Sequence, residues 1–463
     1  MRVQLLSPYP QITNIATTQY PPLGLLYIGA NICDIVDELQ ILDANILMLN
    51  KKQTIEKIKE YKPSVLGISV NVVTAKIARE IALFVKKDMP EVKLIAGGPS
   101  PTIDPSEWLK YFDVVIAGEG EIPFRNVIEQ LKKGNKSIDV SCAGICIKDH
   151  NYEISEHPDL DSLPFPAYDY LMPKLQYYSK TARIVKKYMA PILTSRGCPY
   201  GCVFCDKSVH GRNFRPRSAE SVLREIKWLH EKYGIRQLDI LDDNFTFDMD
   251  RASMILDGII SIDKFAINCQ NGIRADRIDE QLAKKMKRAG VFRAGIGIES
   301  GNVEVLNKLN KQLDLNNVIK AIKILRTQRI TTQGYFIIGF PYEEKKNIID
   351  TINFAIKANP HLANFSHFFP IIGTPIYNEL KKEGKLLFSN GEVEDGFYRA
   401  NTHIVSDKIT HEEMAKIYRW AWRKFYFRPL KIVDVIFSIN SWKELVWIMR
   451  IALSMLKNKL LKF

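Results

Sequence analysis

The sequence lacks an uninterrupted apolar run of about 18 residues, the length that a membrane-spanning helix needs, so no segment predicts a bilayer span. The opening MRVQLLSPYP has one Arg, a short apolar run and two prolines, which is too short for a secretory signal peptide. Cysteine is also scarce, with seven in 463 residues and none after Cys269. These absences argue against a disulfide-linked secreted protein, and we expect a cytoplasmic protein whose cysteines serve metal or redox chemistry.

Two common ligand-binding signals are missing from the first 150 residues. There is no G-x-G-x-x-G dinucleotide fingerprint, and no histidine precedes His150. The overall composition, with 46% hydrophobic and 25% charged residues, is typical of a folded globular protein. The length predicts about three domain-sized units.

Residues 1–150 predict a doubly wound, Rossmann-like α/β domain. Short β-branched runs alternate with helical stretches, as in a parallel sheet covered on both faces. Strands are predicted at 3–6, 39–42, 65–70, 93–96 and 114–117, and helices at 24–32, 54–61, 75–86 and 123–132. Glycines follow the last two strands, in LIAGGPS and VIAGEGE. A ligand is therefore expected at the carboxyl ends of this sheet.

A second α/β series follows a Pro- and aromatic-rich linker at residues 151–189. Six strands are predicted at 191–194, 237–241, 266–270, 294–298, 331–338 and 364–369, with helices such as 219–233, 280–289, 315–328 and 345–357 between them. Residues 190–410 therefore predict a partial (β/α)6 barrel, in which chemistry is placed at the C-terminal strand ends. Residues 411–463 predict a helical, basic and aromatic C-terminal region.

The segment TSRGCPYGCVFCDKS carries the clearest chemical signal. Its C-x-x-x-C-x-x-C spacing puts the thiolates of Cys198, Cys202 and Cys205 on one loop after the first barrel strand. An iron-sulfur cubane held by three cysteines instead of four keeps one iron open to a reactant. A zinc site is the alternative, but it would ordinarily need a fourth ligand and a second C-x-x-C pair.

The order of motifs resembles that of the cobalamin-binding radical S-adenosylmethionine (SAM) enzymes, which include many C-methyltransferases. PPLGLLYIGA, GGPSPT, GEGEIPF, LDSLPFPAYDYL and the three-cysteine loop carry the resemblance, which covers about residues 1–430. It implies a 4Fe-4S cluster, SAM and cobalamin as cofactors. In that family the open iron binds SAM, whose cleavage releases a 5′-deoxyadenosyl radical.

The resemblance also implies which residues contact SAM. LDDNFTF, QNGIRAD, GIGIESG and GYFIIGFP match the family's cofactor-contact segments, and Phe204 in the cysteine loop would pack on the adenine. The candidates are Asp242, Asp243 and Asn244 for the amino group, Arg274, Glu299 and Ser300 for the carboxylate and ribose, and Ile338 and Gly339 for the adenine. Helix capping and surface ion pairs are the alternative roles of these polar residues.

The implied cobalamin contacts lie at the ends of the N-terminal strands. They are Ser69, Val72, Thr74, Gly97, Gly98, Pro99, Glu119 and Gly120. Glycine permits the close backbone approach that a broad flat ring requires, although tight turns without a ligand are the alternative. Because no histidine precedes His150, this domain would give the cobalt no histidine ligand.

The predicted function is methyl transfer to an unactivated carbon, with no catalytic residue singled out beyond the cofactor contacts. An oxidative cyclisation or rearrangement on a tetrapyrrole or lipid-like substrate is the alternative, and a cobalamin sensor would not need the three-cysteine loop. Flavodoxin or ferredoxin is the expected electron donor. No nucleic-acid substrate is expected, because Cys33, Cys142 and Cys146 lack the spacing of the extra cysteine trio in tRNA-thiomethylating relatives.

The C-terminal region suggests a membrane contact. Residues 416–463 hold eleven Lys and Arg against Asp434 and Glu444, which accounts for most of the chain's net charge of +13. Residues 443–461 predict a basic amphipathic helix, which favours peripheral contact at the inner membrane face and an apolar or lipid-like substrate; burial against the barrel is the alternative. His367 and Tyr377, in NFSHFFPIIGTPIY, are candidate substrate contacts, with core packing as the other role for these aromatics.

Overall fold

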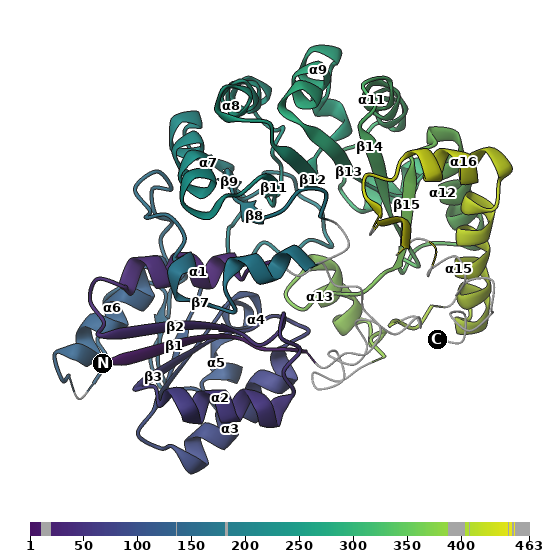
Figure 1. Cartoon of the computed structure of the whole chain (residues 1–463). Coiled ribbons are helices and arrows are strands. Elements are labelled where there is room, and N and C mark those ends of the chain that lie inside the picture. The colour runs from purple at the N-terminus through teal and green to yellow at the C-terminus, as the bar shows by residue number, and fades with distance from the viewer. Residues whose placement is uncertain are drawn as a thin grey trace.

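The structure is a computed structural model that describes residues 1–10, 20–135, 137–180, 184–387, 403–406, 408–442, 444–446 and 449. Two large β-sheets and a group of C-terminal helices make up this part of the chain (Figure 1). No helix within these ranges is long and apolar enough to cross a membrane.

The N-terminal sheet has the doubly wound architecture that the sequence predicts. Its five predicted strands are β1 (Arg2–Ser7), β2 (Glu38–Asp43), β3 (Val65–Ser69), β4 (Lys93–Gly97) and β5 (Val114–Ile116), in the order β5-β4-β3-β1-β2, all parallel. Alternate residues of β1 enter different cores, Leu5 on one face and Leu6 on the other. Helices α1 (Leu23–Ile32) and α6 (Glu121–Lys132) cover the first face, and α2 (Lys51–Tyr61) and α3 (Ala75–Asp88) cover the second.

Two short strands extend this sheet beyond the predicted five. β6 (Ile145–Cys146) pairs antiparallel with β5, and β7 (Leu171–Met172), from the segment predicted as a linker, pairs parallel with β2. Each is two residues long, so neither has a periodicity that sequence reasoning could detect. The same region holds the short helices α4 (Pro99–Ile103), α5 (Pro105–Trp108), η1 (Tyr168–Tyr170) and η2 (Leu175–Lys180).

The second sheet is a six-stranded parallel arc in the order β15-β14-β13-β12-β11-β8. Its strands are β8 (Met189–Ile192), β11 (Gln237–Ile240), β12 (Ala266–Ile273), β13 (Val291–Glu299), β14 (Thr331–Ile338) and β15 (Leu362–His367). Figure 1 shows helices on the outer side of the arc: α7 (Ala219–Tyr233), α8 (Met249–Ile262), α9 (Glu280–Ala289), α11 (Leu315–Thr327) and α12 (Lys345–Ala358). β8 and β15 form the two edges, so the arc is the partial barrel that the sequence predicts.

Local chain chemistry fixes where the barrel helices begin and end. Asp279 caps α9 by accepting a hydrogen bond from the Leu282 amide at 2.7 Å, and Gly290 ends the helix at φ 99°. A Cβ at Gly290 would lie 2.0 Å from the Phe265 carbonyl oxygen, so only glycine lets the chain turn directly into β13. This tight turn starts β13 level with β12.

The C-terminal helices pack against the last barrel strands. They are α13 (Pro375–Lys382), α15 (His411–Tyr426) and α16 (Pro429–Phe437). The Tyr426 hydroxyl donates to the Ala363 carbonyl at 2.7 Å and accepts from its amide at 2.9 Å, which joins α15 to β15. Asp434 on α16 pairs with Arg326 on α11 at 2.8 Å. The predicted helical C-terminal region is therefore present, although Lys443, Trp447, Ile448 and residues 450–461 of the predicted amphipathic helix lie outside the described residues.

Candidate functional site

The loop that carries the three cysteines is held in place by hydrogen bonds that do not involve their thiols. The loop runs between β9 (Ser195–Arg196) and β10 (Arg215–Pro216). Lys207 Nζ donates to the Cys198 carbonyl at 2.7 Å, and the Val203 amide donates to the Leu309 carbonyl at 3.1 Å. All three thiols are free, as are those of the other four cysteines. These contacts hold the loop in place and leave its thiols available for coordination.

The donor set fits an iron-sulfur cluster better than a single ion. Within the described ranges, no three His, Cys, Asp or Glu side chains converge closely enough to hold one metal ion. A cluster does not need such convergence, because each thiolate binds a different iron. Burial raises the pKa of the Cys202 thiol. Metal coordination, which replaces the thiol proton, is the ordinary way to stabilise such thiolates.

A buried ion pair lies beside these thiols. Lys311 Nζ donates to Glu299 Oε1 at 2.8 Å, and Glu299 has a φ of 66°, a strained conformation for a residue other than glycine. Burial lowers the pKa of Lys311, but the Glu299 carboxylate and the Cys202 thiol raise it overall. The ammonium group therefore supplies a fixed positive charge to an anionic site. Sequence reasoning missed Lys311, since nothing in its surroundings distinguishes it from a surface lysine.

Arg274 holds the cysteine loop in the structure. Its guanidinium lies 3.6 Å from the centroid of the Tyr200 ring and donates to the Gln312 carbonyl at 2.6 Å and to Asp276 at 2.9 Å. These contacts occupy the fork that sequence reasoning assigned to the SAM carboxylate. We therefore assign Arg274 to positioning the loop.

The three polar residues after β11 have different surroundings. Asp242 is fully buried and accepts hydrogen bonds from the Thr194 amide at 2.7 Å and the Ser195 hydroxyl at 2.5 Å, while Asp243 is exposed. Asn244 is buried, yet neither its amide oxygen nor its amide nitrogen has a partner in the described structure. A buried amide without partners costs about 1–3 kcal/mol per unpaired group. Asn244 therefore fits a polar ligand such as SAM, whereas Asp242 links β11 to the segment after β8.

The residues predicted to contact the SAM carboxylate and adenine also differ in their surroundings. The Ser300 hydroxyl is fully buried and bonded to the Thr351 hydroxyl at 3.0 Å, so it joins β13 to α12. Ile338 is fully buried at the end of β14, and Gly339 follows it at φ 91°. Phe204 is half-buried, with its ring centroid 5.8 Å from that of Phe340. The Phe204–Phe340 contact thus brings the cysteine loop next to the turn that follows β14, which begins at Gly339.

Glu343 organises the turn after β14 and was missed from the sequence. One carboxylate oxygen accepts from the Gly339 amide at 2.7 Å and the Phe340 amide at 2.9 Å, and the other has no partner in the described structure. Burial raises the pKa of Glu343 to about 7. Its position four residues after Gly339, in GFPYEE, is a signal that could have identified it.

The candidate cobalamin contacts at the N-terminal strand ends, which we call the cradle, are mostly half-buried and uncharged. Ser69, Val72, Gly97, Gly98 and Pro99 are half-buried there, and Thr74 is buried against Asn71. A Cβ at Gly97 would come no closer than 3.7 Å to any atom, whereas one at Gly98 would lie 2.7 Å from the Val70 carbonyl oxygen. Gly98 is therefore required by the turn, whereas a methyl group at Gly97 would lie at ordinary contact distance from Ile116. Glycine at these half-buried positions fits the close approach of a flat ring.

Glu119 has a different role from the one expected. Its carboxylate is buried and pairs with Arg196 at 2.8 Å, with His210 at 2.8 Å and with Arg215, while Glu121 pairs with Arg196 at 2.6 Å. Glu119, Glu121, Arg196, His210 and Arg215 form what we call the domain-bridging network. Burial opposes the charge of Glu119, but His210 and Arg196 hold its pKa at about 2. Gly120 lies between these two acids, and a Cβ added to it would lie 3.0 Å from the Ile28 side chain.

The two candidate substrate contacts, His367 and Tyr377, have different surroundings in the structure. His367 ends β15, stacks on Tyr418 with centroids 4.3 Å apart, and has no partner for either ring nitrogen among the described residues. Burial and the nearby His403 lower its pKa to about 4, so the ring is neutral at pH 7. Tyr377 is buried in α13. Of the two, His367 has the unpaired polar atoms that a substrate could use.

Known proteins match both halves of the chain. The B12 binding domain matches residues 12–128 and the Radical SAM superfamily matches residues 192–355. An uncharacterized methyltransferase of Pyrococcus horikoshii is 29% identical, over 95% of each chain. Cytidylyl-2-hydroxyethylphosphonate methyltransferase of Streptomyces wedmorensis is 28% identical over 78% of each chain, and the anaerobic magnesium-protoporphyrin IX monomethyl ester cyclase of Synechocystis is 26% identical over 78% of this chain and 73% of its own.

The fold also matches a solved structure. The cobalamin-dependent S-adenosylmethionine radical enzyme OxsB, with aqua-cobalamin and S-adenosylmethionine bound, superposes with a TM-score of 0.74 at 17% identity, over 94% of this chain and 70% of its own. That likeness shows the fold. The two domain matches, together with the three-cysteine loop, show that the chain belongs to the cobalamin-binding radical SAM enzymes.

Proposed function

We propose that this enzyme transfers a methyl group to an unactivated carbon of a small molecule. The domain-bridging network is the observation that carries the proposal. Arg196 lies two residues before Cys198 and forms buried ion pairs with Glu119 and Glu121, directly after the strand ends of the N-terminal sheet. The network therefore fixes the cysteine loop beside the cradle, and radical generation and methyl donation would have a common site.

The residues that would hold each cofactor lie on separate elements. Cys198, Cys202 and Cys205 would bind the 4Fe-4S cluster, and Asn244 with Phe204 and Gly339 would contact SAM. Ser69, Val72, Gly97 and Pro99 would lie under cobalamin. When bound, the reduced cluster would supply the electron that splits SAM into methionine and a 5′-deoxyadenosyl radical, and cobalamin would supply the methyl group.

The chain's own residues would orient the substrate and keep the site apolar. His367 is neutral at pH 7 because its pKa is about 4, so it offers one ring N–H donor and one acceptor. Its stacking on Tyr418 and the nearby rings of Phe340 and Phe368, 4.8 Å apart, favour a substrate with a large apolar part. Such a setting protects a carbon radical from water and from polar side reactions.

Oxidative cyclisation or rearrangement without methyl transfer is the second candidate. The likeness to the magnesium-protoporphyrin cyclase favours it, but that likeness is lower in identity and covers less of the chain than the likeness to the Pyrococcus protein. The count of SAM molecules separates the two. Methylation would consume two per product and leave one methyl group in it, whereas cyclisation would leave none.

We also propose where the enzyme works and what reduces it. All seven cysteines are free, as expected in the reducing cytoplasm, where flavodoxin or ferredoxin could supply the electron that the cluster needs. A peripheral contact with the inner face of the membrane belongs to this proposal, together with an apolar or lipid-like substrate.

The proposal can be tested on the anoxically reconstituted protein. After incubation with cobalamin and gel filtration, we expect a corrinoid absorption spectrum together with that of the cluster. With methyl-labelled SAM, a reductant and extract from a strain lacking the gene, one labelled product should form with equal amounts of 5′-deoxyadenosine and S-adenosylhomocysteine. Absence of the corrinoid spectrum, or unlabelled product alone, would overturn the methyltransferase proposal.

A further inference from the structure

Helix α16 is inverted with respect to an ordinary surface helix. Its charged residues point inward: Lys431 is 3% exposed and donates to the Pro360 carbonyl at 2.8 Å, and Asp434 pairs with Arg326. Its apolar residues point outward, with Leu430 86% and Phe437 85% exposed. An ordinary surface helix turns its apolar stripe to the core. An outward apolar stripe on a well-anchored helix indicates a surface that is covered in use.

The exposed apolar surface continues beyond α16. We call it the α16 patch, and its described members are Leu430, Ile432, Val433, Ile436, Phe437, Trp442, Leu445, Val446 and Met449. Trp442 is 72% exposed. The segment carrying these residues is anchored by Arg293, which pairs with buried Glu444, and by Asn440, whose side chain donates to the Thr331 hydroxyl at 3.3 Å. The patch is therefore held on the barrel, at the end where the strands begin.

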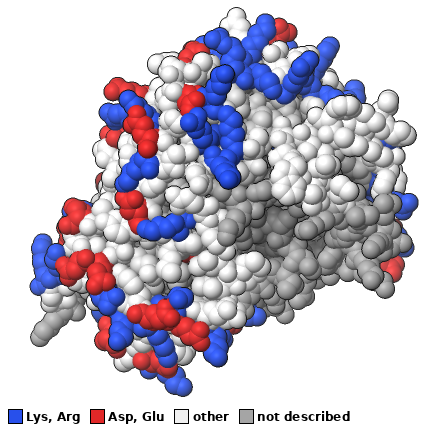
Figure 2. Space-filling model, in the orientation of Figure 1, with Lys and Arg blue, Asp and Glu red and all other residues white. Residues whose placement is uncertain are grey.

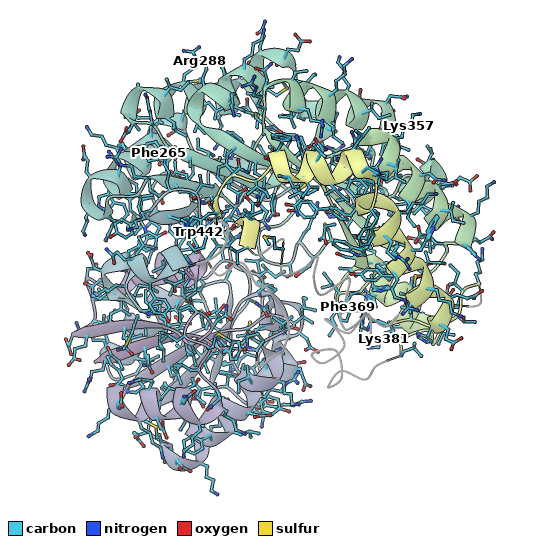
Figure 3. The ribbon with its side chains drawn as sticks, turned by 45° about the vertical axis from the view of Figure 1, so that its right-hand side comes forward. Phe265, Arg288, Lys357, Phe369, Lys381 and Trp442 are labelled. Carbon is cyan, nitrogen blue, oxygen red and sulfur yellow. The ribbon has the colours of Figure 1, made fainter. Side chains whose placement is uncertain are left out.

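Basic side chains surround the same end of the barrel. Because the six strands are parallel, the residues that precede them share one edge. Exposed cations there are Arg236, Lys264, Lys287, Arg288, Arg329 and Lys357. Figure 2 shows an uncharged area where α16 lies in Figure 1, with Lys and Arg side chains gathered above it. Figure 3 shows α16 between Arg288 and Lys357 on one side and Trp442 on the other.

A hollow beside α16 is lined by both charged and apolar side chains. It has a volume of about 400 Å³ and is lined by Arg326, Arg428, Lys431, Asp434, Asn359, Pro429 and Leu430. Three cations face one carboxylate, so the hollow carries a positive surplus next to an exposed leucine. One terminal nitrogen of Arg428 is buried there without a hydrogen-bond partner in the described structure. A phosphate oxygen would satisfy that donor.

We propose that the barrel end carrying the α16 patch binds an anionic phospholipid bilayer. Exposed Leu, Ile, Phe and Trp side chains would enter the interfacial region, while the surrounding Lys and Arg contact lipid phosphates. The sequence after Met449 has the same character: residues 450–463 contain Arg450 and three lysines among Ile, Leu, Met and Phe. The C-terminal strand ends, with the cysteine loop, lie at the opposite end of the barrel. The active site therefore stays open to its reductant while the protein is docked.

Vesicle flotation of the full-length holoenzyme tests this surface without reference to activity. Vesicles of phosphatidylcholine alone are compared with vesicles containing phosphatidylglycerol, at low and high salt. We expect flotation with the anionic vesicles, and at least a tenfold lower apparent affinity for the double variant Leu430→Ser, Phe437→Ser. The control Leu83→Ser, Met254→Ser changes two side chains that are 55% and 62% exposed elsewhere, and it should float like the wild type.

Two results would overturn the proposal. One is wild-type protein that stays unbound to anionic vesicles while remaining monomeric in sedimentation analysis. The other is a dimer that dissociates in the Leu430→Ser, Phe437→Ser variant, because the patch would then bind a second copy of the chain. Formation of 5′-deoxyadenosine by the double variant, measured in detergent-free buffer, should equal that of the wild type. Loss of lipid binding is thus distinguishable from failure of the proposed chemistry.

Discussion

The two sheets place their candidate contacts at the same position, after the strands, but differ in the residue types they place there. In both, the candidate contacts follow the carboxyl ends of parallel strands. The N-terminal strand ends offer glycine, as at Gly97, and two of their buried acids, Glu119 and Glu121, pair with the barrel. The barrel strand ends instead hold polar groups such as Asn244 and the Glu299–Lys311 pair. A broad ring requires shape from its site, whereas a small zwitterion requires matched polar groups.

The largest effect should come from the barrel's metal ligands. Replacing Cys202 with Ala should abolish the cluster spectrum and reduce 5′-deoxyadenosine formation to background, because two thiolates cannot hold the cubane as three do. The matched control is Cys142→Ala, which changes a free cysteine of the N-terminal half and should leave both readouts unchanged. Retained 5′-deoxyadenosine formation in the Cys202 variant would contradict the assignment.

Breaking the link between the two sheets should have the next largest effect. Arg196→Met leaves Glu119 and Glu121 buried without their shared cation, which should lower the free energy of unfolding by about 3–5 kcal/mol. Urea unfolding measures it. The control Arg125→Met removes an exposed pair with Asp34 and should cost about 0–1 kcal/mol. Equal losses in the two variants would show that the network does not hold the sheets together.

The domain-bridging network should also make the free energy of unfolding depend on pH. The pKa of Glu119 is about 2 in the folded chain, below its ordinary value of 4.5, so its ionised form stabilises the fold. This contribution is complete above pH 4.5 and is lost as the pH falls toward 2. Glu119→Gln should flatten the decrease in unfolding free energy across that window. An unchanged slope in the variant would show that other carboxyl groups control it.

Neighbouring residues after β11 should respond in opposite ways. Asn244→Ala should weaken SAM binding about tenfold, near 1.4 kcal/mol, with little change in melting temperature, because no described residue pairs with this amide. Asp242→Ala should lower the melting temperature instead, because Thr194 and Ser195 lose their acceptor. Calorimetric titration with SAM and thermal unfolding measure the pair. A destabilised Asn244→Ala variant with unchanged SAM affinity would reverse our assignment.

The smallest effect should be at the cradle. Gly97→Ala has room for its methyl group within the protein, so folding should be unchanged, while corrinoid retention should fall a few-fold if the ring approaches this backbone. The absorption spectrum after gel filtration measures retention. Gly98→Ala is the contrasting variant: its φ of 104° and the 2.7 Å contact predict loss of folded protein. Full corrinoid retention by Gly97→Ala would show that the ring does not approach the backbone at the end of β4.

Sequence reasoning recovered the framework of both sheets because strand and helix periodicities are local. The short apolar runs at residues 65–70 and 93–96 predict β3 and β4, and the three-cysteine spacing marks the loop after β8. It could not find β6 and β7, since a two-residue strand exists only through its partner. Nor could it find Lys311, whose burial depends on elements far along the chain.

What the sequence by itself determined is the order of the two sheets, the free cysteine loop and the glycine-lined strand ends, all set by neighbouring residues. Only the tertiary structure decided which polar residues remain available to a ligand. Asp242 bonds Thr194, 48 residues away, Glu119 bonds Arg196, 77 residues away, and both were expected to contact cofactors. Asn244 has no such partner in the part of the chain that the structure describes. The physical reason is that a buried polar group must be paired, and its partner is fixed by the fold rather than by the local sequence.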